Sequence, residues 1–187
     1  MKFFPKLLCM SINYQSLLIA DAKGPGLLKD WLEYQDSLTD KLKAMTGNAE
    51  LERLSQNWAI PNWWDRYVLG IQNNSIFQRE IVMKNQGIVY WYARSVIPQS
   101  CYALKPEFFN RLENESIRNL IFDESSVRRL PILCYPVDQL NLEFHWVNKY
   151  IRSEYSQMWV RLTELVFQEK SSFYLVEILL PELENLL

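Results

Sequence analysis

The sequence predicts a single α+β domain, built on a mostly antiparallel sheet of about six strands with covering helices. The chain has 187 residues, 49% of them hydrophobic and 22% charged, which suits one well-packed domain and excludes wholesale disorder. Apolar residues recur at helical spacing in two regions, and segments rich in aromatic and β-branched residues recur elsewhere. No repeat or flexible linker divides the chain. We therefore expect a domain over residues 25–187, preceded by an N-terminal extension over residues 1–24.

The first helical region follows Pro25 and Gly26. Apolar residues at 27, 28, 31 and 32, and then at 38, 42 and 45, have the spacing of one helix or of two short helices. Ser37 and Asp40 have the spacing of a helix cap, and Gly47 can end the helix. The break at 36–37 predicts a joint between two helices.

From Arg66 onwards the pattern favours strands. Residues 67–71, 77–83 and 88–98 are rich in aromatic and β-branched side chains, and residues 84–87 have the composition of a hairpin turn. The segments on either side of this turn are therefore expected to pair as an antiparallel hairpin.

The second helical region begins at Pro106 and carries apolar residues as far as Ile121. Residues 127–147 are apolar but irregular, which is typical of one or two strands joined by a loop. Residues 159–167 fit a strand and a helix almost equally well. We prefer the strand, because a polar turn at 168–172 and an apolar run at 173–180 would complete a terminal hairpin.

Composition argues against several classes of function. The 20 basic and 22 acidic residues leave a net charge of -2, so no general attraction to nucleic acid is expected. The single histidine, His145, excludes a cluster of histidine metal ligands, and a histidine among aromatic residues is more often packed or exposed than catalytic. No nucleotide-binding glycine motif is present.

The cysteines and the N-terminus bear on localisation. The three cysteines are far apart, which argues against a disulfide framework and fits a reducing, cytoplasmic compartment. The N-terminal segment lacks the cleavage site of a signal peptide. No apolar stretch is long enough to span a membrane, so we expect no stable membrane insertion.

One carboxylate stands out because it interrupts an apolar run. Glu177 lies within residues 173–180, which are otherwise apolar or aromatic. If its neighbours are buried, the charge must find a partner or the pKa must rise, and such a carboxyl can donate a proton or bind a hydroxyl group. The alternative is an outward-facing glutamate on an edge strand.

Two arginines flank the expected hairpin turn. If Met83 faces Ile88, then Arg79 faces Tyr92, and Arg94 emerges on the same face as Arg79. Two guanidinium groups on one face suit an anion such as a carboxylate. A change of register by one residue would put them on opposite faces. The alternative is that each pairs with a surface acid such as Glu80.

Four short motifs carry a resemblance to a known family. They are Leu28-Lys29-Asp30-Trp31-Leu32 with Asp36-Ser37-Leu38-Thr39, Arg79-Glu80-Ile81, Ala93-Arg94-Ser95-Val96-Ile97-Pro98, and Val176-Glu177-Ile178-Leu179-Leu180-Pro181. In this order and spacing they resemble the chorismate lyase family, over about residues 26–181. The chain departs from the family pattern at 116–118, where Ser-Ile-Arg replaces Pro-Leu-Gly, and at 159–163, where the second arginine of Trp-x-Arg-Arg-Ser is replaced. The stretch between 129 and 159 is also longer.

The resemblance implies a six-stranded antiparallel sheet with an enclosed site under helical flaps. It also implies residue roles. Arg79 would hold the carboxylate of the aromatic ring, helped by the backbone near Leu38, and Glu177 would contact the ring oxygen. Arg94 would help with the enolpyruvyl side, and Ile117 would close over the ligand. Loss of pyruvate makes the ring aromatic, so the implied reaction requires neither a metal ion nor a redox cofactor.

We therefore expect a monomeric lyase that converts chorismate to 4-hydroxybenzoate and pyruvate in the first step of ubiquinone biosynthesis. The alternative is a non-catalytic binder of an aromatic acid, because the same sheet serves as a sensing domain in some transcriptional regulators. No DNA-reading helical module precedes the domain within these 187 residues, which counts against a regulator. A purely structural protein would leave the two arginines and the acid without a purpose.

Overall fold

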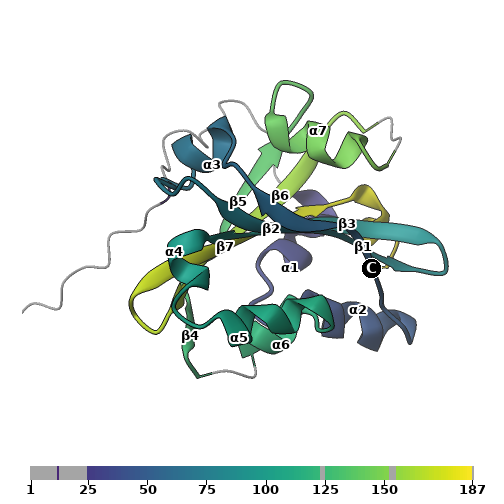
Figure 1. Ribbon diagram of the computed structural model, residues 1–187. Helices are drawn as coiled ribbons and strands as arrows, with labels where there is room; N and C mark the ends of the chain where they lie inside the picture. Colours follow the sequence, from purple (N-terminus) through teal and green to yellow (C-terminus); the bar gives the residue numbers. More distant parts are fainter. Residues whose placement is uncertain (1–11, 13–24, 123–124, 152–154, 187) are drawn as a thin grey trace, which may run out of the picture.

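The computed structural model describes residues 12, 25–122, 125–151 and 155–186. These residues form one sheet of seven antiparallel strands with helices on both faces (Figure 1). The strands run in the order β1-β2-β3-β7-β6-β4, and β5 also pairs with β6. The predicted α+β domain with a mostly antiparallel sheet is confirmed, with seven strands where about six were expected.

The elements have the following bounds. The strands are β1 (Glu50–Ala59), β2 (Ile76–Asn85), β3 (Ile88–Pro98), β4 (Val127–Arg129), β5 (Leu133–Val137), β6 (Met158–Phe167) and β7 (Ser171–Leu179). The α-helices are α1 (Lys29–Leu32), α2 (Leu38–Thr46), α3 (Trp63–Tyr67), α4 (Gln99–Tyr102), α5 (Pro106–Asn110), α6 (Ile117–Phe122) and α7 (Leu142–Asn148). Short 3-10 helices are formed by Gly26–Leu28, Arg111–Glu113 and Pro181–Leu186.

The side chains of each strand alternate between two faces, and each face has its own buried core. On one side of the sheet lie α1, α2, α5 and α6, which contribute residues such as Trp31 and Phe109 to the core (Figure 1). On the other side lie α3 and α7, which contribute Trp64 and Phe144. These are called the α2/α6 face and the α3/α7 face below.

The predicted joint between the first two helices is confirmed. The Ser37 hydroxyl accepts a hydrogen bond of 3.1 Å from the backbone N–H of Asp40 and caps α2, while Gly47 ends the helix at a φ of 81°. The cap fixes the first turn of α2 against the sheet, and Ser37 and Leu38 are both buried there.

Three segments differ from the prediction. The polar, half-exposed edge strand β1 was missed, because its composition resembles that of a loop. Residues 67–71 form no strand: α3 ends at Tyr67, and the apolar residues that follow are buried in a turn against the α3/α7 face. Helix α7 lies where only strands and a loop were expected, because two buried residues one turn apart, Phe144 and Val147, are too few to show a period.

The turn between β2 and β3 is confirmed, but the expected register is wrong. Gln86 and Gly87 both have positive φ, as a two-residue hairpin turn requires. Ile88 pairs with Asn85 rather than Met83, and an irregularity next to Met83 shifts the register again. As a result Arg79 pairs with Ser95 and Arg94 pairs with Glu80, so the two arginines point to opposite faces.

The terminal hairpin of β6 and β7 is confirmed. Phe167 pairs with Ser171, and the same register places Arg161 opposite Glu177. Strand β7 lies between β3 and β6. Glu177 therefore sits in the middle of the sheet, and the alternative of an edge-strand glutamate is wrong.

The expected N-terminal extension lies outside the described residues, apart from Ile12, which is buried in the core of the α3/α7 face. The boundary of the extension therefore stays a prediction. Within the described ranges, no helix combines the length and the apolar composition needed to cross a bilayer.

Candidate functional site

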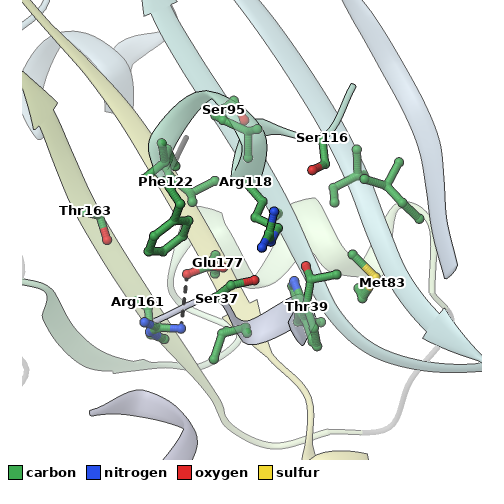
Figure 2. Close-up of a pocket in the computed structure, with 18 of the residues that line it drawn as sticks. Ser37, Thr39, Met83, Ser95, Ser116, Arg118, Phe122, Arg161, Thr163 and Glu177 are labelled. Atoms are coloured by element: carbon green, nitrogen blue, oxygen red, sulfur yellow. Dashed lines mark ion pairs between the residues drawn. The ribbon is translucent and has the colours of Figure 1, made fainter. Parts of the chain in front are cut away.

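A pocket lies between the α2/α6 face of the sheet and the helices α2 and α6 (Figure 2). Its floor comes from six strands and its walls from the start of α2 and from α6. The strand residues are Leu51, Arg79, Ile81, Met83, Trp91, Ala93, Ser95, Arg129, Arg161, Thr163, Leu175 and Glu177. The wall residues are Asp36, Ser37, Leu38, Thr39, Ser116, Ile117, Arg118, Ile121 and Phe122. The charged members are four arginines and two acids, so the pocket favours an anion.

The structure brings together four of the five residues expected at a site. Arg79, Glu177, Leu38 and Ile117 all line the pocket, although they come from four separate elements. Arg94 does not line it, because it points to the α3/α7 face. The expectation that Arg79 and Arg94 share one face is therefore wrong.

Arg79 is a buried cation whose hydrogen-bonding capacity is only partly used. Its side chain is 6% exposed, and Nη1 donates a hydrogen bond of 2.9 Å to the backbone carbonyl of Glu115. Its Nε is buried without a hydrogen-bond partner, and no acid among the described residues forms an ion pair with it. Burial and the nearby Arg53 charge lower the pKa of Arg79. A bound carboxylate would supply the missing counter-charge.

Glu177 is a largely buried acid on the same face. Its side chain is 12% exposed, and Oε2 lies 3.4 Å from Nη1 of Arg161. Burial raises the pKa of Glu177, while the charges of Arg161 and Arg129 act in the opposite direction. The net effect keeps a proton on this carboxyl at a higher pH than on an exposed glutamate, so it can donate a hydrogen bond or a proton.

Arg161 is a pocket residue to which the sequence interpretation gave no role. It lies on β6, directly opposite Glu177 (Figure 2), and is 2% exposed. Its Nη2 donates a hydrogen bond of 2.6 Å to the backbone carbonyl of Tyr34. Counting back from the expected turn at 168–172 pairs residue 163 with residue 177. The observed strand β7 begins at Ser171 instead, which puts Arg161 opposite Glu177.

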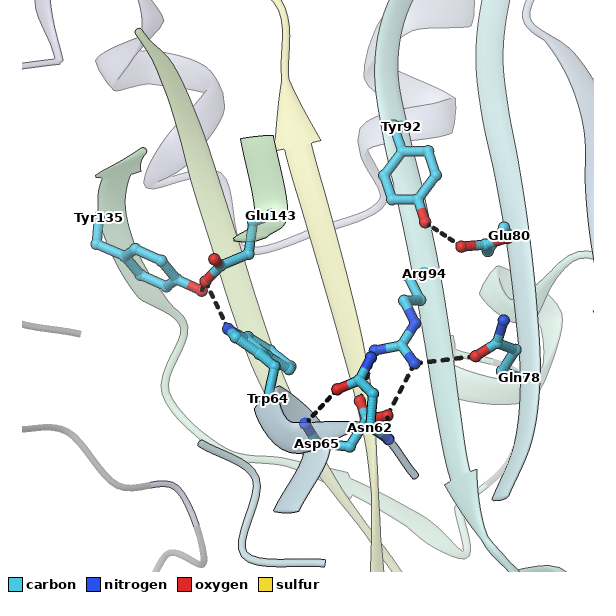
Figure 3. A network of polar contacts seen from close by, with 9 residues as sticks. All are labelled: Asn62, Trp64, Asp65, Gln78, Glu80, Tyr92, Arg94, Tyr135 and Glu143. Carbon is cyan, nitrogen blue, oxygen red and sulfur yellow. Dashed lines mark hydrogen bonds and ion pairs between the residues drawn. The ribbon is translucent and has the colours of Figure 1, made fainter. Parts of the chain in front are cut away.

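Arg94 instead forms the centre of a buried network on the α3/α7 face (Figure 3). Its Nη1 and Nη2 donate to the two carboxylate oxygens of Asp65 at 2.5 and 3.0 Å, and Nη2 also donates to the Gln78 side chain at 2.9 Å. The guanidinium lies 4.8 Å from the ring centre of Trp146. Because Asp65 also caps α3 together with Asn62, this ion pair attaches the helix to the sheet.

The other acids of this face are also fully engaged. Glu80 accepts hydrogen bonds from the hydroxyls of Ser55, Tyr92 and Tyr150, at 2.6, 2.7 and 2.8 Å. Burial alone would raise the pKa of Glu80, but these hydrogen bonds outweigh burial and lower it. The alternative interpretation paired Glu80 with an arginine. In the structure, the hydroxyl groups of Ser55, Tyr92 and Tyr150 bind it instead. A third acid, Glu143, accepts from Trp64 and Tyr135.

His145 lies away from the pocket. It is exposed on α7, and its Nε2 is 2.9 Å from the backbone carbonyl of Gln139. In the described ranges, no three His, Cys, Asp or Glu side chains gather in a way that could hold a metal ion.

The sequence matches a family model described as chorismate lyase over residues 20–169. The curated relatives that the chain matches carry the name probable chorismate pyruvate-lyase, among them the following three. The one from Aromatoleum aromaticum is 23% identical over 122 residues, a region that covers 65% of this chain and 66% of the relative. The one from Pseudoalteromonas atlantica is 24% identical over 162 residues, covering 83% and 80%. The one from Pasteurella multocida is 29% identical over 121 residues, covering 60% and 71%. The chain thus spans just under two thirds of the first relative's length.

Two solved structures share the fold. A transcriptional regulator of the GntR family from Bacillus cereus has a TM-score of 0.52 at 11% identity, covering 72% of this chain and 92% of the regulator. PhnF from Mycobacterium smegmatis has a TM-score of 0.56 at 13% identity, covering 80% and 65%. At these identities the likeness shows the fold alone.

Proposed function

The chain belongs to the chorismate lyase family, and we propose that it converts chorismate to 4-hydroxybenzoate and pyruvate in the pocket on the α2/α6 face. The observation that carries the proposal is that Arg79, a buried cation without an acidic partner, and Glu177, a buried acid of raised pKa, line the same pocket. The aromatic product has a carboxylate at one end of its ring and a hydroxyl at the other. If this chain has the same role as the family, its product would enter ubiquinone biosynthesis.

The sheet sets the distance between these two groups. Arg79 is on β2 and Glu177 on β7, with β3 between them, so their backbones lie about 10 Å apart across the strands. In the proposed complex, one ring would lie between the guanidinium of Arg79 and the carboxyl of Glu177. Arg79 would hold the ring carboxylate through paired N–H donors. The free backbone N–H groups at the start of α2, next to Leu38, would add further donors.

The pocket walls would fix the ring once it is bound. Leu38, Ile117 and Trp91 supply apolar surface around the space between Arg79 and Glu177. Ile117 is the first residue of α6, which forms one wall of the pocket. A ring held in one orientation loses less freedom on the way to the transition state.

The proposed reaction needs no oxidant or reductant. The bond between the ring and the ether oxygen breaks, and its electron pair completes the carbonyl group of pyruvate. The hydrogen on the hydroxyl-bearing ring carbon moves as a proton to the methylene carbon of the enolpyruvyl group, and the electron pair that it leaves completes the aromatic ring. Protonated Glu177 would donate a hydrogen bond to the ether oxygen, on which negative charge develops as the bond breaks.

The direct test is to mix the purified full chain with chorismate and to measure both products. We expect equal amounts of 4-hydroxybenzoate and pyruvate to be released. The fold is shared with transcriptional regulators, so the competing result is tight binding of an aromatic acid without turnover. That result would overturn the proposal and favour a sensor.

Replacing Arg79 with alanine is expected to weaken the binding of 4-hydroxybenzoate by about 10- to 100-fold, because hydrogen bonds to a charged group contribute about 1.5–3 kcal/mol. Titration calorimetry would measure the affinity. Arg128→Ala is the matched control, because Arg128 is exposed and pairs with Glu169 outside the pocket. If Arg79→Ala binds the product as well as the unaltered protein does, Arg79 does not hold the carboxylate.

A further inference from the structure

The pocket continues past Glu177 to a second buried arginine. Arg161 is 2% exposed, and one of its nitrogens, Nη2, is bound to the backbone carbonyl of Tyr34. Its other two nitrogens, Nε and Nη1, are buried without a hydrogen-bond partner. Nη1 lies within ion-pair distance of Glu177, at 3.4 Å, but does not form a hydrogen bond with it. Arg161 therefore lies close enough to Glu177 to interact with its charge, but the N–H groups of Nε and Nη1 remain available to a ligand.

A second cation lies in the same pocket. Arg129 lines the same pocket from β4, half-buried, with its guanidinium 5.4 Å from the ring centre of Phe122. No ion pair joins Arg129 to an acid in the part of the chain that the structure describes. Burial and the charge of Arg161 lower the pKa of Arg129, while Glu177 and Asp36 act in the opposite direction. The two arginines thus share the pocket with one largely buried carboxyl, that of Glu177, and one exposed acid, Asp36.

We propose that Arg161, with Arg129 beside it, forms a second carboxylate-binding subsite that receives the enolpyruvyl carboxylate of the substrate. That a second carboxylate binds here follows from the unpartnered donors; its identity as the enolpyruvyl group rests on the proposed function. A guanidinium presents paired N–H donors in the geometry of a carboxylate, and it does so most effectively when it is buried.

The order of the strands supports this assignment. The sequence of strands β2, β3, β7, β6 places Arg79 at one end, Glu177 on the third strand and Arg161 on the fourth. Arg161 is thus one strand spacing, about 4.8 Å, beyond Glu177, and three spacings, about 14 Å, from the strand of Arg79. A ring held between Arg79 and Glu177 would direct an ether substituent on its far side towards Arg161.

The subsite has a consequence for selectivity. Chorismate carries two carboxylates, whereas 4-hydroxybenzoate carries one. The dianion would engage both arginine sites, and the aromatic product would engage Arg79 alone. Arg161 would therefore favour substrate over product, which the site at Arg79 cannot do because both molecules present the same ring carboxylate to it.

Two unreactive ligands that differ by one carboxylate test the subsite without turnover. They are 4-hydroxy-3-methoxybenzoate and 3-(carboxymethoxy)-4-hydroxybenzoate. The unaltered protein is expected to bind the second ligand about 10- to 100-fold more tightly, as one added charged contact implies. In Arg161→Met this advantage should disappear, while the affinity for the methoxy ligand stays within about twofold. Titration calorimetry measures all four affinities.

Further variants make the test decisive if Arg161→Met does not fold. Arg161→Lys keeps the charge but loses the paired donors, so it should retain only part of the advantage. Arg129→Met should also reduce the advantage, and Arg128→Ala, its exposed neighbour on β4, should leave it intact. An unaltered protein that binds the two ligands equally, or an advantage that survives in the Arg161 and Arg129 variants, would overturn the subsite.

The outcome separates the two proposals. If the advantage is present but chorismate is not converted, the lyase proposal fails and the dicarboxylate subsite stands. If chorismate is converted but the advantage is absent, the subsite fails and the lyase proposal stands.

Discussion

Replacing Glu177 with glutamine is expected to lower the turnover of chorismate by about 10²–10⁴-fold, the range attributed to a general acid or base. Glutamine has nearly the same shape, but its amide N–H is a much weaker acid and hydrogen-bond donor than a carboxyl O–H, so it stabilises the developing charge on the ether oxygen far less. The full chain and the variant would be compared by the rate of pyruvate release at saturating chorismate. Circular dichroism and thermal unfolding would confirm that the variant is folded.

The pH dependence of turnover gives the same prediction a second readout. Burial raises the pKa of Glu177, so the protonated form persists to a higher pH than in an exposed glutamate. If that form is active, turnover should fall as the pH rises through the raised pKa. This falling limb should be missing in Glu177→Gln, which cannot titrate there.

Glu169→Gln is the matched control for this experiment. Glu169 lies in the turn of the same β6–β7 hairpin, is exposed, and pairs with Arg128 outside the pocket. Its replacement should leave both the rate and the pH profile unchanged. Turnover in Glu177→Gln that equals that of the control would remove Glu177 from the proposed chemistry.

The position of Glu177 in an apolar strand could be predicted from the sequence because the signal was local. A single carboxylate in an apolar run next to a predicted turn must lie either at an edge or in a buried site, and the central position of β7 decides between them. The helix cap at Ser37 and the terminal hairpin were predictable for the same reason, since each depends on residues close together in the chain.

Features that depend on register were not predictable. The irregularity next to Met83 shifts every pair beyond it along β2 and β3. No local pattern marks it, yet it decides that Arg79 lines the pocket and Arg94 does not. Strand β1 was missed for a related reason: an edge strand that is half exposed needs no apolar alternation, so its sequence resembles that of a loop.

Replacing Arg94 with methionine is expected to lower the free energy of unfolding by about 3–5 kcal/mol, because the change leaves the buried carboxylate of Asp65 without its partner. Arg94 and Asp65 are 3% and 0% exposed, so solvent does little to screen the pair. Urea unfolding followed by circular dichroism would measure the change. The folded fraction should still bind 4-hydroxybenzoate, because Arg94 lies on the α3/α7 face and not in the pocket.

A double-mutant cycle with Asp65→Asn separates a structural role of Arg94 from a catalytic one. Asparagine keeps a side-chain oxygen near the cap of α3 but carries no charge, so Arg94→Met should cost clearly less stability in that background than in the unaltered protein. The difference reports the energetic coupling of the pair. A variant Arg94→Met that keeps its full stability but loses turnover would show instead that the arginine acts on the substrate. The Arg94–Asp65 pair joins α3 to the face of the sheet opposite the pocket, so we expect replacement of Arg94 to change the stability of the protein and not its turnover.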